Sequence, residues 1–365
     1  MLVKIVLPVE THSFTPKTQS KGNAVADIDP AEVGRLVRQV LGDSLGYLYP
    51  AALRVAVRLG IADLLVDGPQ TPEQLAETAG VDAHYLYRIL RFLAVRKVFE
   101  EDSAGRFQLT PAAELLRADS PASVRSTVLL LTDGTIYWTP AGRLEDTVRN
   151  GKTAFDDIFG SPLFDYLNEN EEAGNVFHTG IADLSTREQS GIAASYDFPE
   201  TGLVVDVAGG PGGFLATVLR QNPGLRGLLV EQDALLRQNR LDDPEIAGRW
   251  ETAEADFFSE VPSGGDFYVL KRVLHDWDDE SCVRILRTCR AAMSDAAKLL
   301  VIDAVVPTGN DPHPAKLYDI AMMINFNGKE RTEAEFHQLF AASGLKVGRI
   351  ITAPGTLSIV EAIPV

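Results

Sequence analysis

One stretch of the sequence, residues 203–214, constrains the fold more than any other. It reads Leu203-Val-Val-Asp-Val-Ala-Gly-Gly-Pro-Gly-Gly-Phe214, and a helical pattern follows as far as Arg220. A buried strand that enters a helix through a glycine-rich turn leaves the backbone N–H groups at the helix start open to a ligand. The stretch therefore indicates a parallel α/β sheet and a nucleoside cofactor, but alone it does not distinguish a dinucleotide from other cofactors.

From this stretch onward, strand patterns alternate with helical patterns, which predicts an open, doubly wound α/β sheet. Only a few residues around Pro354 and Gly355 join the last two strands, which is too short a link for a parallel crossover. We therefore expect a Rossmann-like α/β domain over residues 196–365, with seven strands and an antiparallel last strand. The strands are expected at 203–207, 225–231, 249–255, 266–271, 298–303, 346–352 and 357–362.

Residues 31–120 predict a separate, mostly α-helical unit. Thr71-Pro72-Glu73-Gln74 supplies an N-cap, a proline at the first helical position and a capping-box glutamine, and Gly80 ends that helix. Asp82 caps the next helix, and residues 98–109 alternate as a β-hairpin around Ser-Ala-Gly. Two helices followed by a hairpin form a winged-helix-like domain. Residues 1–30 are expected to form a flexible arm, and residues 121–195 connecting helices that contribute to the substrate pocket.

Charge argues against nucleic acid as a partner. The chain has a formal net charge of −17, and residues 51–120 contain eight Lys or Arg against ten Asp or Glu. The expected wing begins with Glu100, Glu101 and Asp102, which would repel phosphates, whereas DNA-binding modules are normally basic. We therefore interpret the winged-helix-like domain as a dimerisation module.

Nothing in the sequence indicates a membrane or an oxidising compartment. No run approaches the ~18 apolar residues of a transmembrane helix, and the apolar start over residues 1–9 lacks a cleavage site for a signal peptide. Cys282 and Cys289 lie two helical turns apart, ~10 Å along a helix, which is too far for a disulfide. Both are expected to be buried thiols of a cytoplasmic protein.

One residue in the strand before the glycine-rich turn and one in the turn itself favour S-adenosylmethionine over a nicotinamide cofactor. Pro211 lacks the N–H that a pyrophosphate would bind, and the carboxylate of Asp206 would repel phosphate but suits an ammonium or a sulfonium. Glu231, at the end of the second strand, is placed to accept the ribose hydroxyls. Asp256 and Phe257, after the third strand, could bind the adenine amine and cover its ring.

Two further motifs carry a family resemblance. They are Leu270-Lys-Arg-Val-Leu-His-Asp-Trp-Asp-Asp279 and Gly328-Lys-Glu-Arg-Thr332. Together with the glycine-rich turn and the N-terminal domain, they resemble the caffeate/acetylserotonin-type family of small-molecule O-methyltransferases, including its bacterial antibiotic-tailoring branch. The resemblance covers most of the chain. It implies S-adenosylmethionine as the cofactor and a homodimer formed through the N-terminal domain.

The resemblance also assigns roles to single residues. His275 falls on the general base of the family, and Asp303 and Glu330 on two acids that orient it. The family commonly has glutamate where this chain has Asp303, and Ala208 replaces the first glycine of its usual triple. The implied cofactor-binding residues are Asp206, Gly209, Gly210, Glu231, Asp256, Phe257 and Lys271, of which Lys271 would hold the methionyl end.

The acceptor of the methyl group is expected to be an aromatic hydroxyl. A phenol of pKa ~10 lies ~3.5 units above a histidine of ~6.5, and a carboxylate beside the imidazole reduces this gap. An aliphatic alcohol would be a much poorer substrate. The expected substrate-binding residues, some of which are equally compatible with core packing, are Trp138, Phe164, Phe177, His178, Asp319, Met322, Met323, Asn325 and Phe326.

Several alternatives stay open at this point. Asp276 and the acids at 278–280 are also typical of the capped first turn of a helix over 281–293, and no metal site is expected, because consecutive side chains do not converge at a helix start. Some members of the superfamily use S-adenosylmethionine for decarboxylation or hydroxylation, but these tend to lose the base that His275 would supply. A DNA-binding ligand sensor and an NAD-dependent oxidoreductase are the remaining alternatives.

Overall fold

The computed structural model describes residues 28–237 and 239–365, so most of the expected N-terminal arm lies outside the described residues. Internal contacts divide the chain into two units, residues 1–50 and 51–365. In the first unit, helix α1 (Pro30–Ser44) starts from an Asp29 cap with proline at its first position, and none of its residues is buried. Helix α2 (Leu48–Arg58) begins in the first unit and continues into the second.

The winged-helix-like prediction is confirmed in the second unit. Thr71 and Gln74 form the expected capping box, Gly80 ends the helix in the left-handed conformation, and Asp82 caps the next helix. Strands β1 and β2 pair antiparallel as the expected hairpin. The elements of this region are α3 (Ile61–Leu64), α4 (Pro72–Ala79), α5 (Ala83–Ala94), β1 (Phe99–Glu101), β2 (Phe107–Leu109) and α6 (Pro111–Glu114).

A series of helices follows, and the last of them is long enough to reach the sheet. Their shared core is apolar and largely aromatic, with Phe155 fully buried and Phe177 nearly so. The elements are α7 (Arg125–Leu131), the π-helical turn η1 (Gly134–Trp138), α8 (Thr139–Ala141), α9 (Leu144–Asn150), α10 (Ala154–Phe159), α11 (Leu163–Glu169) and α12 (Glu171–Ala194). Helix α12 contacts both α7 and α13 (Gly213–Gln221).

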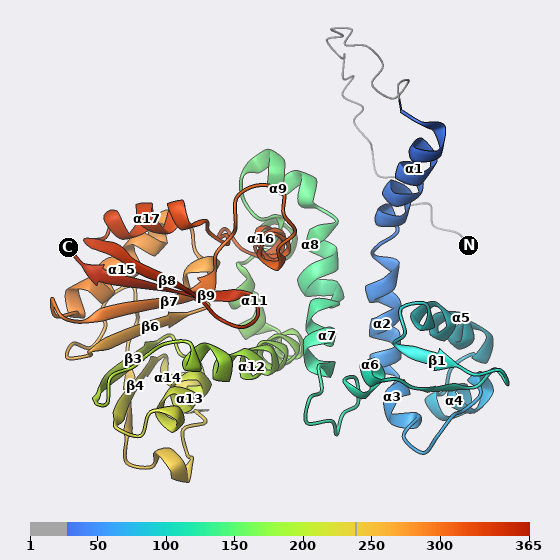
Figure 1. The fold of residues 1–365 in the computed structure, drawn as a ribbon, viewed down its shortest axis with the longest axis horizontal. Coiled ribbons are helices and arrows are strands. Elements are labelled where there is room, and N and C mark those ends of the chain that lie inside the picture. Colours follow the sequence, from blue (N-terminus) through green and yellow to red (C-terminus); the bar gives the residue numbers. More distant parts are fainter. Residues whose placement is uncertain (1–27, 238) are drawn as a thin grey trace, which may run out of the picture. The chain divides into compact units, whose positions relative to one another are not determined.

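The C-terminal region is the predicted seven-stranded α/β sheet (Figure 1). Its strand order is β5-β4-β3-β6-β7-β9-β8; the first five are parallel, and β9 runs antiparallel to both β7 and β8. The strands are β3 (Gly202–Val207), β4 (Leu225–Glu231), β5 (Trp250–Glu254), β6 (Phe267–Lys271), β7 (Lys298–Ala304), β8 (Leu345–Thr352) and β9 (Leu357–Pro364).

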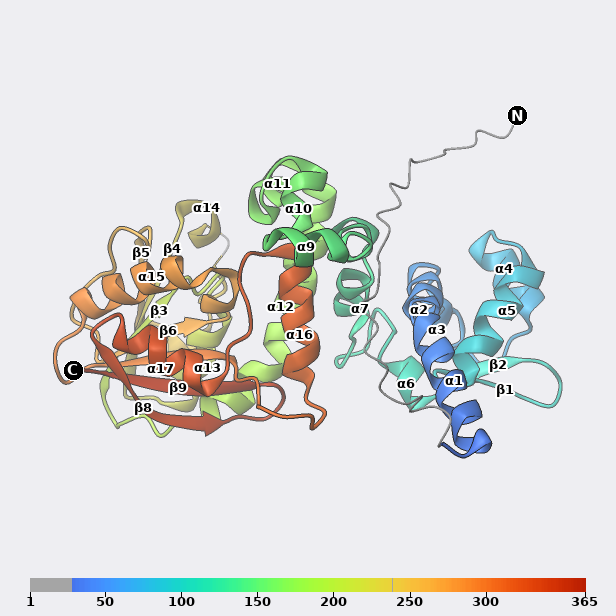
Figure 2. The ribbon, with the colours of Figure 1, turned by 90° about the horizontal axis from the view of Figure 1, so that it is seen from above.

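Helices cover both faces of this sheet (Figure 2). One core packs α12 and α13 against β3, β7 and β9, and the other packs α15 and α17 against the opposite face. Cys282 and Cys289 are buried, unpaired thiols in the second core. The remaining elements are α14 (Asp233–Leu236), η2 (Pro244–Ile246), η3 (Leu274–Asp276), α15 (Asp279–Ala292), α16 (Pro314–Asn325) and α17 (Glu333–Ala341).

This topology fixes where a site can form. The order of the parallel strands reverses between β3 and β6, and ligands of open α/β sheets bind at the carboxyl ends of the strands at such a switch point. The glycine-rich turn follows β3, and the segment that carries His275 follows β6, so both lie at that edge. Among the helices of the described residues, none is long and apolar enough to cross a membrane.

Candidate active site

The turn after β3 is shaped by close packing of its backbone. Ala208 and Gly210 both have a φ of +55°, in the left-handed backbone region that residues other than glycine rarely adopt. A Cβ atom on Gly209 would lie 2.5 Å from Oδ2 of Asp206, so only glycine fits there. The turn therefore folds directly over the Asp206 carboxyl group.

Asp206 is a buried acid without a partner. It is 1% exposed, and no described group makes a hydrogen bond with either of its carboxyl oxygens. Burial raises its pKa to about 7, with a smaller increase from the neighbouring Glu231 and an opposing decrease from Lys271. An unpartnered carboxyl group at this edge fits a ligand with cationic or hydrogen-donating groups, and it does not fit a pyrophosphate.

Glu231 and the segment after β5 form the next part of this edge. Both Glu231 oxygens accept backbone hydrogen bonds, from Gly210 at 3.0 Å and from Gln232 at 2.8 Å. Asp256 is exposed and accepts hydrogen bonds from the Phe258 amide and the Ser259 hydroxyl, both at 2.9 Å. The neighbouring rings form an aromatic group whose members are Phe257, Phe258 and Trp277.

His275 lies in the short η3 turn, almost fully buried and surrounded by carboxyl groups. Its Nδ1 is 3.0 Å from Oε1 of Glu330, and its Nε2 is 3.5 Å from Oδ1 of Asp276. Burial alone would lower the pKa of His275. The carboxyl groups of Asp276, Asp303 and Glu330 outweigh burial and raise that pKa to about 9.

The acids around His275 have perturbed pKa values for the same reasons. Burial raises the pKa of Asp303 to about 7 and that of Asp276 to about 6, while the charge of His275 opposes both increases. Neither oxygen of Asp303 has a hydrogen-bond partner among the described residues. Titratable groups whose pKa values are pushed toward neutrality in a buried cluster are typical of proton-transfer sites.

The Gly328–Thr332 segment holds the η3 turn in place through backbone contacts. The buried guanidinium of Arg331 donates to the carbonyl oxygens of Leu274 at 2.7 Å and Trp277 at 2.9 Å, on either side of His275. It also donates to Asp279. The same short segment thus supplies a carboxylate to the imidazole and fixes the backbone that carries it.

Lys271 is engaged by groups on α12. Its ammonium donates to the Ser185 hydroxyl at 2.9 Å and to the Glu188 carboxylate at 3.0 Å. Burial lowers the pKa of Lys271, and the charge of Glu188 opposes that decrease. The guanidinium of the next residue, Arg272, forms two hydrogen bonds with the same carboxylate.

Three of the expected acceptor residues come together although they lie far apart in the sequence. The Phe164 ring centroid is 6.1 Å from that of Phe177 and 5.5 Å from that of Phe326. His178 packs edge-on against Phe177, and burial lowers the pKa of its imidazole. Phe164 is only partly covered.

The other expected acceptor residues lie on η1 and α16. Asp319 accepts a hydrogen bond from the backbone amide of Glu330 at 3.0 Å, which ties α16 to the acid beside His275. Asn325 is buried, and its side-chain oxygen has no partner among the described residues. Met322 and Met323 are partly buried, whereas Trp138 is 40% exposed.

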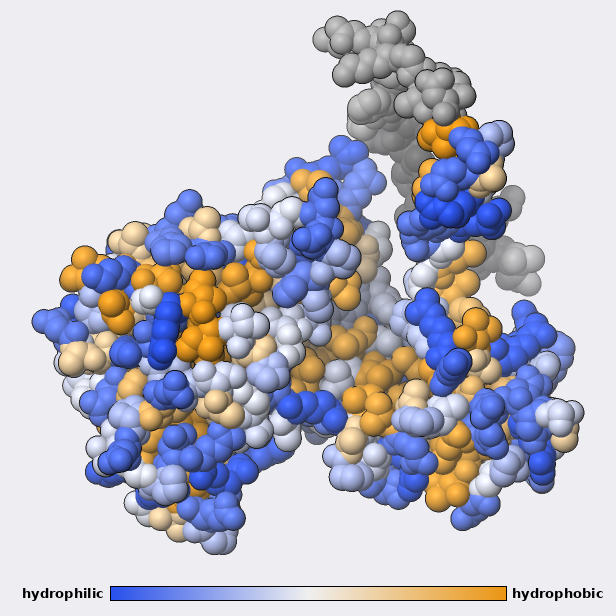
Figure 3. Space-filling model, viewed as in Figure 1, coloured by the Kyte–Doolittle hydropathy of each residue, from blue (hydrophilic) through white to orange (hydrophobic). Residues whose placement is uncertain are grey.

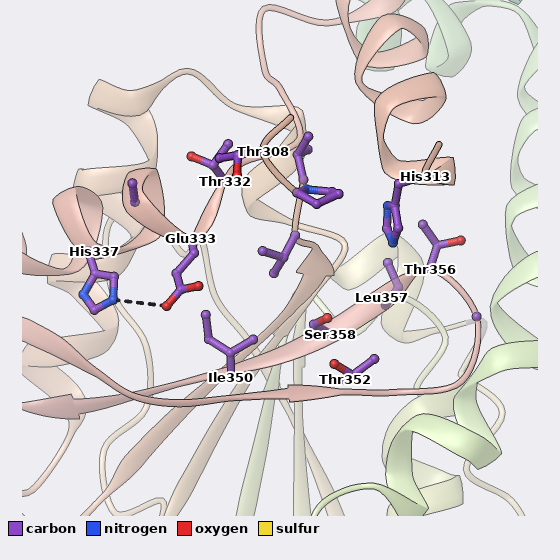
Figure 4. A pocket seen from close by; sticks show the side chains of 15 residues that line it. Thr308, His313, Thr332, Glu333, His337, Ile350, Thr352, Thr356, Leu357 and Ser358 are labelled. Atoms are coloured by element: carbon purple, nitrogen blue, oxygen red, sulfur yellow. Dashed lines mark ion pairs between the residues drawn. The ribbon is translucent and has the colours of Figure 1, made fainter. Parts of the chain in front are cut away.

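A separate cavity of about 670 Å³ lies against the face of β8 and β9 that α17 covers (Figure 4). In Figure 4, Thr332 and Glu333 lie on one side of it, Ile350 on another, and His313 at its end. None of the expected site residues lines this cavity. A second cavity, of about 300 Å³, is lined by residues that include Glu188, Arg272 and Tyr318.

Sequence analysis missed several residues of this site. The sequence context of Asp276 is that of an acid at a helix start, but the N-cap of α15 is Asp278, and Asp276 lies beside His275. Arg331 stands inside a recognised motif, but its neighbours Lys329, Glu330 and Thr332 are polar and give no local signal that its side chain is buried. Glu188 and Ser185 belong to no motif, and no local signal indicates that they reach β6.

Comparisons with known proteins identify the family of the chain and agree with its fold. Residues 142–346 match the family model described as an O-methyltransferase domain, and residues 43–119 match the O-methyltransferase dimerisation domain. The chain is 38% identical over 322 residues to phenazine O-methyltransferase PhzM of Lysobacter antibioticus, covering 88% of this chain and 94% of that protein. It is 36% identical over 316 residues to the mitomycin biosynthesis 6-O-methyltransferase of Streptomyces lavendulae, covering 85% and 89%.

A solved structure shows the same likeness in three dimensions. CalO1, a methyltransferase in calicheamicin biosynthesis solved in its S-adenosylhomocysteine-bound form, matches with a TM-score of 0.83 and 44% sequence identity. The match covers 93% of this chain and all of that chain.

Proposed function

Because the chain belongs to the O-methyltransferase family, we propose that it transfers the methyl group of S-adenosylmethionine to a phenolic hydroxyl of an aromatic natural product. The relatives named above act in phenazine and mitomycin chemistry, and the solved neighbour acts in calicheamicin biosynthesis. The observation that carries the proposal is the contact of 3.0 Å between His275 and Glu330 inside a buried group of carboxylates.

The chain offers groups that fit the cofactor. The unpartnered Asp206 carboxyl group suits its cationic part, and Glu231 lies at the end of the neighbouring strand, where ribose hydroxyls could donate to it. Phe257, in the aromatic group after β5, could cover the adenine, with Asp256 beside it. When bound, the cofactor supplies a methyl group activated by a sulfonium, so the protein has only to align the acceptor and remove its proton.

The carboxylates around His275 make it a stronger base than an ordinary histidine. A phenol of pKa ~10 lies about one unit above an imidazole whose pKa is about 9, instead of ~3.5 units above a free one. The uphill proton transfer then costs roughly 1–2 kcal/mol rather than about 5. Glu330 holds Nδ1, which leaves Nε2 as the nitrogen that would accept the acceptor's proton.

Asp303 contributes charge rather than a hydrogen bond in this proposal. It is buried near His275 and raises the pKa of the imidazole, but it makes no hydrogen bond with any described group. The chain carries aspartate where its family commonly has glutamate, and the shorter side chain agrees with this lack of contact. We assign Glu330 to orientation and both acids to stabilisation of the imidazolium.

For the acceptor site we propose the aromatic group on α11, α12 and the end of α16. Phe164, Phe177 and Phe326 offer ring faces and edges to a planar substrate, and the backbone link from Asp319 to Glu330 connects their region to the base. The remaining expected residues, which would complete the walls, are Trp138, His178, Met322, Met323 and Asn325.

We also propose a cytoplasmic homodimer. The dimerisation domain spans residues 43–119, and α1 just before it exposes several apolar side chains beside charged ones (Figure 3). These side chains are Leu36, Val37, Val40 and Leu41. Light scattering coupled to size-exclusion chromatography measures the oligomeric state directly, and a monomer at micromolar concentration would contradict this part of the proposal.

A methyl-transfer screen tests the activity. Purified protein and labelled S-adenosylmethionine are offered catechols, naphthols, phenazinols and anthraquinones, with matching anilines and benzoates as alternative acceptors, in the presence and absence of EDTA. We expect transfer to at least one hydroxyl, unaffected by EDTA because we propose a metal-independent reaction. Transfer to nitrogen alone, or decarboxylation without transfer, would contradict the proposal. Calorimetric titration should show binding of S-adenosylhomocysteine and none of NADH.

A further inference from the structure

One buried carboxylate connects the long helix α12 to the end of strand β6. Oε1 of Glu188 accepts hydrogen bonds from Lys271 Nζ at 3.0 Å and from Arg272 Nε at 2.9 Å, and its Oε2 accepts one from Arg272 Nη2 at 2.8 Å. The three side chains are only 12%, 7% and 16% exposed. We call this arrangement of Glu188, Lys271 and Arg272 the Glu188 clamp.

The clamp acts on a strained part of the backbone. Arg272 has a φ of +55°, which costs on the order of 1 kcal/mol or more for a residue other than glycine. Its backbone amide donates to Ile302 on β7 at 3.0 Å, and its side chain is fixed by the two hydrogen bonds to Glu188. The η3 turn with His275 begins two residues later. The clamp therefore sets the direction in which the chain leaves β6 toward His275.

The guanidinium of Arg272 interacts with acids on two sides. On one side Glu188 pairs with the guanidinium directly. On the other, Asp303 and Glu330 raise the pKa of Arg272 through their charges, and Arg272 in turn lowers the pKa of Asp276. Without the Glu188 charge, two buried cations would lose their counterion, and Arg272 would act more strongly on the acids around His275.

The acids that face His275 are Asp276 on η3, Asp303 on β7 and Glu330 before α17. Further charged or titratable groups act on these acids from the elements around them, and they are Arg272 after β6, Arg331 before α17, Asp319 on α16 and Tyr137 on η1.

We propose that Glu188 is a positioning residue for the methyl-transfer reaction. By binding Arg272 and Lys271, Glu188 fixes the turn after β6 so that His275 faces the acceptor. Its negative charge also weakens the effect of the Arg272 cation on the carboxylates around His275. This inference rests on the function proposed above. It adds a residue of α12 to the groups at the sheet edge, and Glu188 and Arg272 both line the cavity of about 300 Å³ described above.

The test replaces the charge and keeps the shape. In Glu188→Gln we expect kcat/KM to fall about 10- to 100-fold, the size of loss that a displaced reacting group causes. We also expect its rise with pH to move to lower pH. The direction of this shift follows from charge. The variant loses the negative charge of Glu188 and leaves Arg272 without its counterion, which destabilises the protonated form of His275. The pKa of His275 therefore falls, and the imidazole becomes neutral at lower pH. Glu188→Asp retains the charge and should restore the pH profile toward that of the wild type.

Matched controls separate positioning from general damage. Glu172→Gln makes the same change at an exposed position of the same helix and should leave rate and pH profile unchanged. If Glu188→Gln does not fold, Glu188→Gln/Arg272→Gln removes both charges, and its pH profile should return toward the wild-type position. A folded Glu188→Gln protein with the wild-type rate and pH profile would overturn the proposal, as would a profile that shifts to higher pH.

A measurement without any acceptor keeps this inference separate from the proposed activity. The ring carbons of ¹³C-labelled His275 can be titrated by NMR in the free protein, and Glu188→Gln should lower the pKa of that imidazole. If the wild type methylates no acceptor, the proposed function fails while this titration still tests the clamp. An unchanged His275 titration in a folded variant would refute the electrostatic role of Glu188.

Discussion

The backbone of Gly328 lies directly against the backbone of His275. A Cβ atom placed on Gly328 would come within 2.0 Å of the His275 carbonyl oxygen and 2.6 Å of the Trp277 amide nitrogen. Two residues later, the Glu330 carboxylate meets Nδ1 of the same histidine. The close approach of the backbone at Gly328 therefore brings the Glu330 carboxylate within hydrogen-bond distance of the His275 imidazole.

Substitution of Gly328 by alanine should damage both stability and rate. The clash is with backbone atoms that cannot rotate away, so we expect a loss of about 1–3 kcal/mol in the free energy of unfolding and a fall in kcat. Thermal unfolding and steady-state kinetics measure the two effects. Gly42→Ala on α1, where a Cβ would meet nothing within 4 Å, is the control. Wild-type stability and rate in Gly328→Ala would show that this contact does not position the site.

The charge of Glu330 should be visible in the pH dependence of the reaction. A general base works in its neutral form, so a His275 pKa of about 9 predicts that wild-type kcat/KM rises with pH up to about 9. In Glu330→Gln the imidazolium loses a stabilising charge, so the rise should move to lower pH. The rate at the optimum should fall about 100-fold because the orientation of the ring is less well fixed.

Kinetics over pH 6–10 with an acceptor of known pKa measure this shift. Glu251→Gln, at an exposed position of β5, is the control. An unchanged pH profile in Glu330→Gln would contradict the assignment of Glu330.

Asp206 should lower stability at neutral pH while it supports cofactor binding. A folded-state pKa of about 7, against 3.8 for a free aspartate, makes ionisation unfavourable in the folded protein. This penalty is absent below pH 3.8, grows as pH rises to 7 and is then constant, at up to about 4 kcal/mol.

Asp206→Asn should therefore gain stability over the wild type between pH 4 and pH 7, and it should bind S-adenosylhomocysteine more weakly. Denaturant unfolding at several pH values and calorimetric titration measure both effects. If the difference in the free energy of unfolding between Asp206→Asn and the wild type does not change with pH, the pKa of Asp206 is not raised in the folded protein.

Phe164 should affect the acceptor and not the cofactor. It is partly exposed and contacts both Phe177 and Phe326. Phe164→Ala removes about 1–2 kcal/mol of apolar contact, so we expect KM for an aromatic acceptor to rise about tenfold while the Kd for S-adenosylhomocysteine is unchanged. Val148→Ala, at an exposed position of α9, should change neither. Equal effects on both ligands would remove Phe164 from the acceptor site.

Most of the fold follows from local patterns in the sequence. The expected strand at 346–352 appears as β8 (Leu345–Thr352), and the capping box of Thr71 and Gln74 is present as predicted. The antiparallel end of the sheet followed from the short link at Pro354 and Gly355. Such features depend on residues close together in the chain, where periodicity, caps and loop length determine the structure.

The site contains contacts that local patterns do not encode. Glu188 and Lys271 are 83 residues apart, and nothing in the helical pattern of α12 indicates that its polar face reaches the end of β6. Asp276 has the same sequence context as a helix-capping acid, and only the η3 turn directs it toward His275. These contacts depend on how elements pack together, which neither hydrophobic periodicity nor propensity determines.

The most direct measurement of the central claim is the single-turnover rate of methyl transfer in His275→Ala, with S-adenosylmethionine and a phenolic acceptor both saturating. General-base catalysis contributes about 10²- to 10⁴-fold, so the account predicts a loss of that size, with unchanged affinity for S-adenosylhomocysteine and unchanged folding. Transfer by His275→Ala at near the wild-type rate would contradict the account.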